Sequence, residues 1–69
     1  MQRKRVNSSK IRSVGYDERA QTLEIEFGNG EVLQYLRVSH ETWRRLMAAP
    51  NPAAYFEDNI AEDYTSRRA

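Results

Sequence analysis

Apolar and polar residues alternate strictly in one stretch of the chain, between positions 23 and 27. Leu23, Ile25 and Phe27 alternate with two glutamates, which is the period-2 pattern of a half-buried β-strand. A second apolar stretch, VLQYLRV, begins at position 32, and a Gly-Asn-Gly sequence lies between the two. Since Asn and Gly tolerate the positive φ angles of tight turns, the pattern predicts a β-hairpin over residues 22–38.

The hairpin can adopt two registers, and they predict different cores. A two-residue Asn-Gly loop places Ile25 opposite Gln34, whereas a three-residue Gly-Asn-Gly loop, with Gly30 as a left-handed bulge, places Ile25 opposite Leu33. We favour the three-residue loop because it keeps the amide of Gln34 out of the core, where an unpaired amide costs roughly 1–3 kcal/mol. The longer loop also pairs Leu23 with Tyr35 and leaves two apolar residues on the other face, Val32 and Leu36.

A further strand is predicted before the hairpin, over residues 10–17. Ile11 and Val14 are an odd number of positions apart, so a β-bulge near Arg12 and Ser13 is needed to place both on one face. A polar link over residues 17–21 joins this strand to the hairpin. Three consecutive strands with short links favour an antiparallel meander.

The pattern changes to helical spacing after Ser39, a residue type that commonly caps a helix N-terminus. Trp43, Leu46 and Met47 follow the i, i+3, i+4 spacing of a single apolar helix face. Because proline cannot continue a helix, Pro50 ends this one.

A second helix is predicted directly afterwards, with Asn51 as its cap and Pro52 at the first helical position. Its apolar residues are Tyr55, Phe56 and Ile60, with Tyr64 one turn later. The predicted fold is therefore α+β, a three-stranded antiparallel meander followed by two short helices packed on one face of the sheet.

A chain of 69 residues has room for one domain, and its core is small. We predict a flexible basic lead-in over residues 1–9, a folded domain over residues 10–64 and a frayed C-terminus over residues 65–69. No apolar run approaches the roughly 20 residues of a membrane span, and no apolar segment follows the basic start to make a secretory signal. The absence of cysteine is compatible with a reducing compartment, so we expect a cytoplasmic location without membrane partners.

Several short motifs are distributed along residues 6–64: Ser8-Ser9-x-Ile11, Gly15-Tyr16-Asp17, Leu23-x-Ile25-x-Phe27, Gly30, Tyr35, Val38 and Tyr55-Phe56, followed by Ile60 and Tyr64. Together they resemble the KTSC domain family, which is named after a segment at the C-terminus of some lysyl-tRNA synthetases. The resemblance implies a free-standing small bacterial protein of the α+β class. The family's function is unsettled, and its association with the synthetase implies RNA binding only indirectly.

The sequence departs from the family pattern at two places. Residues 33–35 read Leu-Gln-Tyr where the family carries Tyr-x-Tyr, so one aromatic residue is lost from the third predicted strand. Residues 51–53 read Asn-Pro-Ala where the family often carries Ser-x-Gly, which implies a different start of the second helix. The first departure weakens any role for paired tyrosines in stacking on bases.

The chain shows no pattern of catalytic or metal-binding residues. The serines near its start have no identifiable base, and Glu24 and Glu26 occupy the polar positions of a half-exposed strand, where solvated carboxylates are normal. His40 is the single histidine, and one imidazole among scattered carboxylates does not make a metal site. We therefore predict no enzyme activity, no metal and no cofactor.

Binding of RNA or single-stranded nucleic acid is the first functional hypothesis, although the net charge is only +1. Such ligands bind to basic surfaces that also expose aromatic rings, because every base offers a face for stacking. Basic residues gather near the start of the chain, and Tyr16 is the aromatic residue least needed for a core. The candidate binding residues are Arg3, Lys4, Arg5, Lys10, Arg12, Tyr16 and Arg37.

An interaction with protein is the alternative hypothesis. A three-stranded meander has open edges, and such edges accept an additional strand from a partner or from a second copy of the chain. The apolar residues Val32 and Leu36, on the second face of the sheet, also favour a partner that covers them. This alternative predicts a protein-interaction or homo-oligomerisation module that uses the sheet edge.

Overall fold

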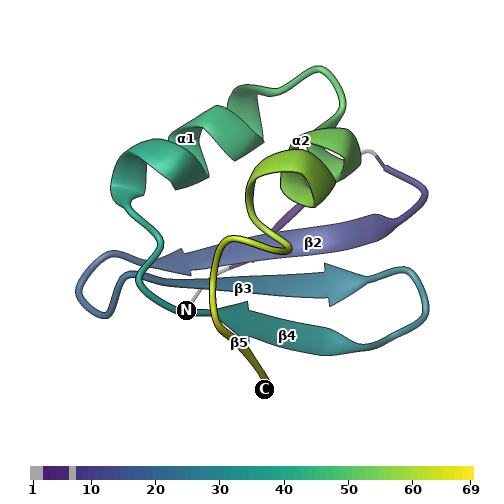
Figure 1. The fold of residues 1–69 in the computed structure, drawn as a ribbon. Coiled ribbons are helices and arrows are strands. Elements are labelled where there is room, and N and C mark those ends of the chain that lie inside the picture. The colour runs from purple at the N-terminus through teal and green to yellow at the C-terminus, as the bar shows by residue number, and fades with distance from the viewer. Residues whose placement is uncertain (1–2, 7) are drawn as a thin grey trace.

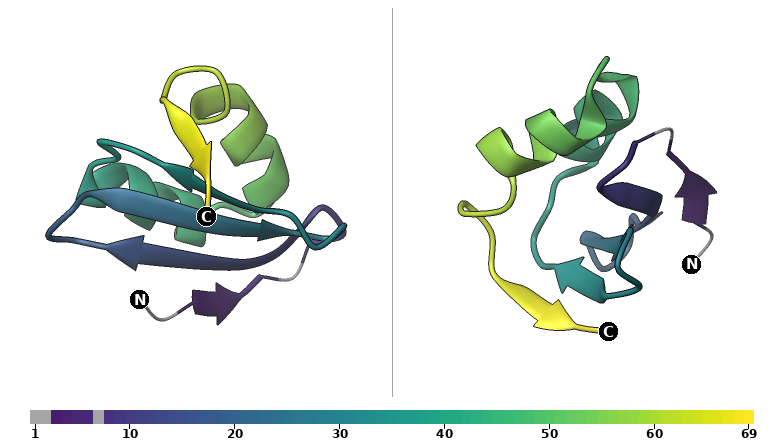
Figure 2. Two further views of the ribbon diagram at one scale, coloured as in Figure 1. Left: turned by 90° about the horizontal axis from the view of Figure 1, so that it is seen from below. Right: turned by 90° about the vertical axis from the view of Figure 1, so that its right-hand side faces the viewer.

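Figure 1 shows the fold in a computed structural model, which describes residues 3–6 and 8–69. The strands form a single antiparallel sheet in the order β1-β2-β3-β4-β5, and two helices cover the same face of that sheet (Figures 1 and 2). The elements are β1 (Arg3–Arg5), β2 (Ile11–Asp17), β3 (Thr22–Phe27), β4 (Val32–Tyr35), α1 (His40–Ala48), α2 (Pro52–Asn59) and β5 (Ser66–Arg68).

The β3–β4 hairpin has the predicted three-residue register. Ile25 pairs with Leu33, and Gly30 has a φ angle of 93°. The loop is closed by the backbone of Phe27, whose carbonyl accepts a hydrogen bond from the Gly30 N–H at 3.0 Å. Gln34 pairs with Glu24 on the face away from the helices, so its amide is outside the core as predicted.

The predicted β-bulge in β2 is also confirmed. The pairing of β2 with β3 shifts between Ile11 and Ser13. The shift places Ile11 and Val14 on the same face, where each is 1% exposed. Both side chains therefore belong to the core beneath the helices.

Both helices begin at their predicted caps. The side chain of Ser39 accepts a hydrogen bond from the Thr42 N–H at 3.2 Å, and the side chain of Asn51 accepts one from the Ala54 N–H at 3.2 Å. These bonds satisfy donors that the first turn of a helix leaves unpaired. Between α1 and α2 the chain bends at Pro50 and Asn51.

The core lies between the helices and the sheet. Phe56 of α2 meets Tyr35 edge-on at a ring-centroid distance of 5.2 Å, and it meets Phe27 in a similar way at 5.6 Å. Seven side chains are less than 2% exposed: Ile11, Val14, Leu23, Ile25, Val38, Leu46 and Ile60. Apolar residues from β2, β3 and both helices thus meet in one layer, as the sequence pattern predicted.

The predicted three-stranded sheet is wrong, because β1 and β5 add one strand at each edge. Both fall in segments that we had placed outside the domain, and positions 1, 2 and 7 of the predicted lead-in lie outside the described residues. Each new strand has three exposed residues, RKR or SRR, without an apolar side chain. Their strand conformation follows from backbone pairing with β2 and β4, which no hydrophobic period reveals.

Candidate functional site

The face of the sheet that the helices leave uncovered, which we call the outer face, is polar. Cross-strand pairing places Arg3 beside Gly15 and Gly15 beside Glu24, and places Gln34 beside Glu24 on the other side. The paired residues that share this face include no aromatic side chain among the described strands. Within the described strands, the outer face therefore offers no ring on which a base could stack.

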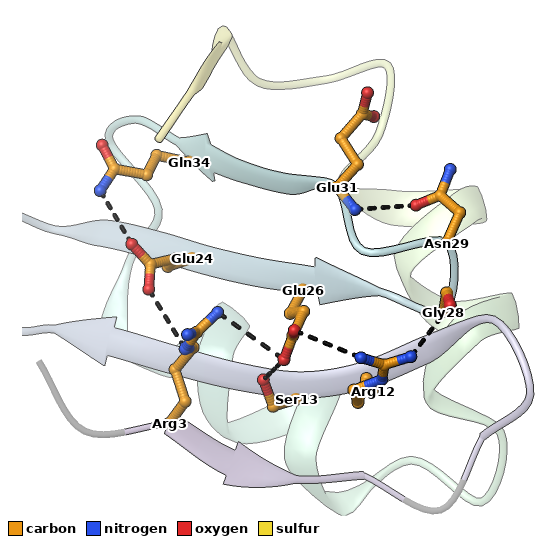
Figure 3. A network of polar contacts seen from close by, with 9 residues as sticks. All are labelled: Arg3, Arg12, Ser13, Glu24, Glu26, Gly28, Asn29, Glu31 and Gln34. Carbon is orange, nitrogen blue, oxygen red and sulfur yellow. Dashed lines mark hydrogen bonds and ion pairs between the residues drawn. The ribbon is translucent and has the colours of Figure 1, made fainter.

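The two glutamates of β3 hold Arg3 on this face (Figure 3). The Nε atom of Arg3 lies 3.4 Å from Oε2 of Glu24, and its Nη1 atom lies 3.9 Å from Oε1 of Glu26. The arginine reaches across β2 to do so, and it can because the intervening Gly15 has no side chain. The side chains of Glu24 and Glu26 are only 16% and 23% exposed, so these ion pairs are partly shielded from solvent.

Glu26 is the centre of a wider network on the outer face (Figure 3). It accepts a hydrogen bond from the Ser13 hydroxyl at 3.0 Å and lies 3.7 Å from Nη1 of Arg12. Arg12 also donates to the carbonyl of Gly28 at 3.2 Å. Our prediction of simply solvated glutamates missed these partners, although two arginines near the start of the sequence were a visible source of them.

The network extends towards β5 through Gln34. Its Nε2 atom donates to Glu24 at 3.0 Å, and its Oε1 atom accepts from Nε of Arg67 at 3.0 Å. The outer face therefore carries arginines at both edges and carboxylates in the middle. Because these charges are opposite and in contact, much of the positive charge predicted to bind phosphates is compensated within the domain.

We predict a measurable coupling between Arg3 and Glu24. In a double-mutant cycle of Arg3→Gln and Glu24→Gln, the coupling free energy of unfolding should be about 0.5–1 kcal/mol, near the upper end for surface pairs because Glu24 is mostly buried. Urea denaturation provides the four free energies. The coupling free energy should decrease in 1 M salt. If the losses caused by the two single substitutions simply add up in the double variant, the ion pair contributes nothing to stability.

The remaining candidate cations do not converge on one surface. Lys10 lies 3.1 Å from Glu57 of α2, and Arg37 lines a hollow with Tyr64, beside the segment that leads to β5. Arg37 has a positive φ of 60°, in the turn after β4. The structure thus brings Arg3, Arg5 and Arg12 together on the outer face. It places Lys4 on the helix side of β1, and it separates Lys10 and Arg37 from this group.

Tyr16, the aromatic candidate on β2, packs against α1. Its ring is stacked on Trp43 with 5.3 Å between centroids and an interplanar angle of 11°, and its hydroxyl donates to the carbonyl of Val38 at 2.6 Å. Burial raises the pKa of the Tyr16 phenol, and the carboxylates of Glu18 and Asp17 raise it further. Tyr16 therefore has a structural role in joining the sheet to α1.

Alkaline pH should destabilise the domain through Tyr16 and Tyr35, since burial also raises the Tyr35 pKa. A raised pKa means that the folded state keeps the phenolic proton longer than the unfolded chain does. The contribution of the two phenols to the free energy of unfolding is therefore fully present below pH ~10, the ordinary tyrosine pKa. It is lost as the pH rises through the pKa that each phenol has in the folded state. Urea midpoints at pH 8, 10 and 11 should fall progressively, and Tyr16→Phe should make this fall shallower. An identical decline in the variant would exclude Tyr16 as a cause.

Sequence reasoning missed a hollow between β1 and the end of α1, which we call the β1–α1 hollow. It has a volume of about 250 Å³ and is lined by Arg5, Val6, Met47, Ala49, Pro50 and Pro52. A second open hollow continues along α1 beside Trp43 and shares Met47 with the first. The indole Nε1 of Trp43 is buried without an acceptor among the described residues. The apolar spacing of α1 was a visible signal for Met47, but the sequence did not show that β1 would lie beside it.

The part of the chain that the structure describes holds no group of three or more His, Cys, Asp or Glu residues able to bind a metal ion. His40 is exposed, and its Nε2 atom lies 3.1 Å from Glu18. Neither described helix has the length and apolar character needed to cross a membrane. The cytoplasmic location stays a prediction.

Comparison with known proteins supports the resemblance seen in the sequence. The KTSC domain family matches residues 7–64. A protein of Stutzerimonas stutzeri strain A1501, described as uncharacterized, is 38% identical over 56 residues, which cover 81% of this chain and 79% of that protein. The crystal structure of the KTSC domain protein YPO2434 from Yersinia pestis has a TM-score of 0.95 and 34% identity, and the match covers 99% of this chain and 96% of that chain. These descriptions name no catalytic activity. The chain belongs to the KTSC domain family.

Proposed function

We propose that this KTSC domain is a non-enzymatic binding module that adds an extended segment of another protein to the open edge of β1. The observation that carries the proposal is the position of β1, at the end of the strand order and beside the β1–α1 hollow. Strand addition uses backbone hydrogen bonds for affinity and neighbouring pockets for selection of side chains. The edge and the hollow together provide both.

The register of β1 determines which backbone groups are available. The N–H of Val6 donates to the carbonyl of Arg12 at 3.1 Å. Hydrogen-bonded and non-hydrogen-bonded pairs alternate along an antiparallel ladder, so the backbone N–H and C=O of Lys4 also point towards β2. The backbone N–H and C=O groups of Arg3 and Arg5 therefore point to the open edge. These two residues are the backbone positions with which a partner strand would pair.

A protein partner fits these features better than a nucleic acid. The outer face lacks aromatic residues in the described strands, Tyr16 is stacked on Trp43, and several of the predicted cations already contact carboxylates. Nucleic-acid binding stays a prediction, and the experiment below treats it as a separate outcome.

A second copy of the chain is a less suitable occupant of the β1 edge. Two β1 strands placed side by side would bring Arg-Lys-Arg against Arg-Lys-Arg, and like charges across paired strands are unfavourable. Charged residues on short edge strands commonly prevent such self-association. We therefore propose a different protein as the partner.

Photo-cross-linking in cells tests this proposal. A photoreactive amino acid at position 5 of β1 should cross-link a discrete protein through an extended segment identified by mass spectrometry. The same group at position 67 of β5 is the matched control and should not recover that protein. Recovery of RNA from position 5, or of the same protein equally from both edges, would contradict the proposal.

A further inference from the structure

We propose that the partner segment alternates acidic and apolar residues, and that one of its apolar side chains enters the β1–α1 hollow. This inference rests on the proposed function and specifies the chemistry of its ligand. It is derived from the two faces of β1, which present different surroundings to a strand added beside it.

The pairing of β1 with β2 separates these two faces. Lys4 pairs with Val14, a core residue beneath the helices, so Lys4 and Val6 lie on the helix side of the sheet. Arg3 and Arg5 lie on the outer face, since they pair with Gly15 and Ser13. Side chains of an added strand alternate between the same two sides.

The helix side offers an apolar contact. Apolar side chains of Val6, Met47, Pro50 and Pro52 line the β1–α1 hollow together with Arg5, and its volume of about 250 Å³ is sufficient for one aliphatic side chain. Methionine adapts its shape to different apolar ligands because its side chain is unbranched and flexible. A partner residue level with Val6 on the helix side would lie against this hollow.

The charges around the edge favour acidic residues at the other positions. Among the described residues, the ion pairs of the domain leave Lys4 and Arg5 without a carboxylate partner, and the same is true of Arg44 on α1. Arg44 lines the hollow that continues along α1. Of these cations Arg5 lies on the outer face, whereas Lys4 lies on the helix side. Because cross-strand pairs of opposite charge stabilise strand pairing, partner carboxylates on the outer face would complement Arg5.

NMR titration with synthetic peptides tests the inference. The probe is an acetylated heptapeptide, Glu-Val-Glu-Leu-Glu-Val-Glu, and the control carries Lys in place of each Glu. The acidic peptide should shift the backbone amide signals of Arg3 and Arg5 and the methyl signal of Met47, which lines the hollow, with at least tenfold tighter binding than the lysine peptide. Replacing its three apolar residues with serine should weaken binding at least fivefold without any change to the protein.

A charge reversal at the edge provides the second arm of the test. Arg5 is exposed and has no ion-pair partner among the described residues, so Arg5→Glu should fold normally and reverse the preference towards the lysine peptide. Equal binding of both peptides, or shifts confined to β5, would overturn the inference. Stronger shifts of the same signals with a uridine oligonucleotide would do so as well. If β1 still cross-links a protein in cells, only the inferred ligand chemistry fails and the proposed function stands.

Discussion

Leu46→Ala should lower the free energy of unfolding by about 2–5 kcal/mol, the usual range for removing a buried leucine side chain. Leu46 is the one fully buried residue of α1 and is 0% exposed, so truncation leaves a cavity between this helix and the core. A domain of this size has little stability in reserve, so the variant should be largely unfolded at 37 °C. Thermal denaturation followed by circular dichroism measures the loss.

The matched control for this prediction is Arg44→Ala in the same helix. Arg44 is exposed and forms no ion pair within the described residues, so its truncation should change the free energy of unfolding by less than about 0.5 kcal/mol. Similar losses in both variants would mean that the packing of α1 against the sheet does not depend on Leu46.

Gly28→Ala should be the second most damaging of these substitutions, with a loss of about 1–3 kcal/mol from overpacking. A Cβ atom at position 28 would lie 2.9 Å from the backbone carbonyl oxygen of Ser9, and a backbone atom cannot move aside alone. The N–H of Gly28 also donates to the carbonyl of Lys10 at 2.9 Å, so the clash would separate the β3–β4 loop from the start of β2. Urea denaturation measures the loss.

A substitution two residues along the loop separates steric from conformational effects. At Gly30 a Cβ atom would meet nothing within 4 Å, but the φ angle of 93° strains any other residue. Gly30→Ala should therefore destabilise the hairpin while leaving the hydrogen bond between residue 28 and Lys10 in place. Hydrogen exchange of the residue 28 amide, after correction for the change in global stability, should become faster in Gly28→Ala and stay unchanged in Gly30→Ala. Unchanged exchange there would contradict the predicted clash.

The features predicted correctly from the sequence depend on local chemistry. The hairpin register follows from the turn preferences of Gly30 and from the polarity of Gln34. The caps at Ser39 and Asn51 follow from side chains that reach nearby backbone donors. Each of these choices is made within a few residues, so the sequence pattern contains the information needed.

The features that the sequence did not reveal depend on distant neighbours. β1 has no apolar residue and becomes a strand because β2 offers it an unpaired backbone edge. The partners of Glu24 likewise become clear only when Arg3 is placed across Gly15, two strands away. A basic segment near the chain start therefore reads as a phosphate-binding patch until the pairing shows which of its charges are compensated.

These placements change what the domain is expected to bind. The arginine on the outer face that contacts Glu24 and Glu26 helps to hold the sheet together, whereas Lys4 and Arg5 have no such partner among the described residues. Arg5 is also one of the residues that line the β1–α1 hollow. The edge of β1 is therefore the part of this domain where backbone groups, positive charge and an apolar surface occur together.

The most direct test of binding at the β1 edge compares Arg5→Pro with Arg5→Gln. Both remove the charge, but only proline removes the N–H that faces the open edge, and the bonds of β1 to β2 through Lys4 and Val6 remain. Calorimetric titration with the segment cross-linked at β1 should show affinity about three- to tenfold weaker for Arg5→Pro than for Arg5→Gln, the cost of one backbone hydrogen bond of roughly 0.5–1.5 kcal/mol. Equal affinities of the two variants would contradict strand addition at β1.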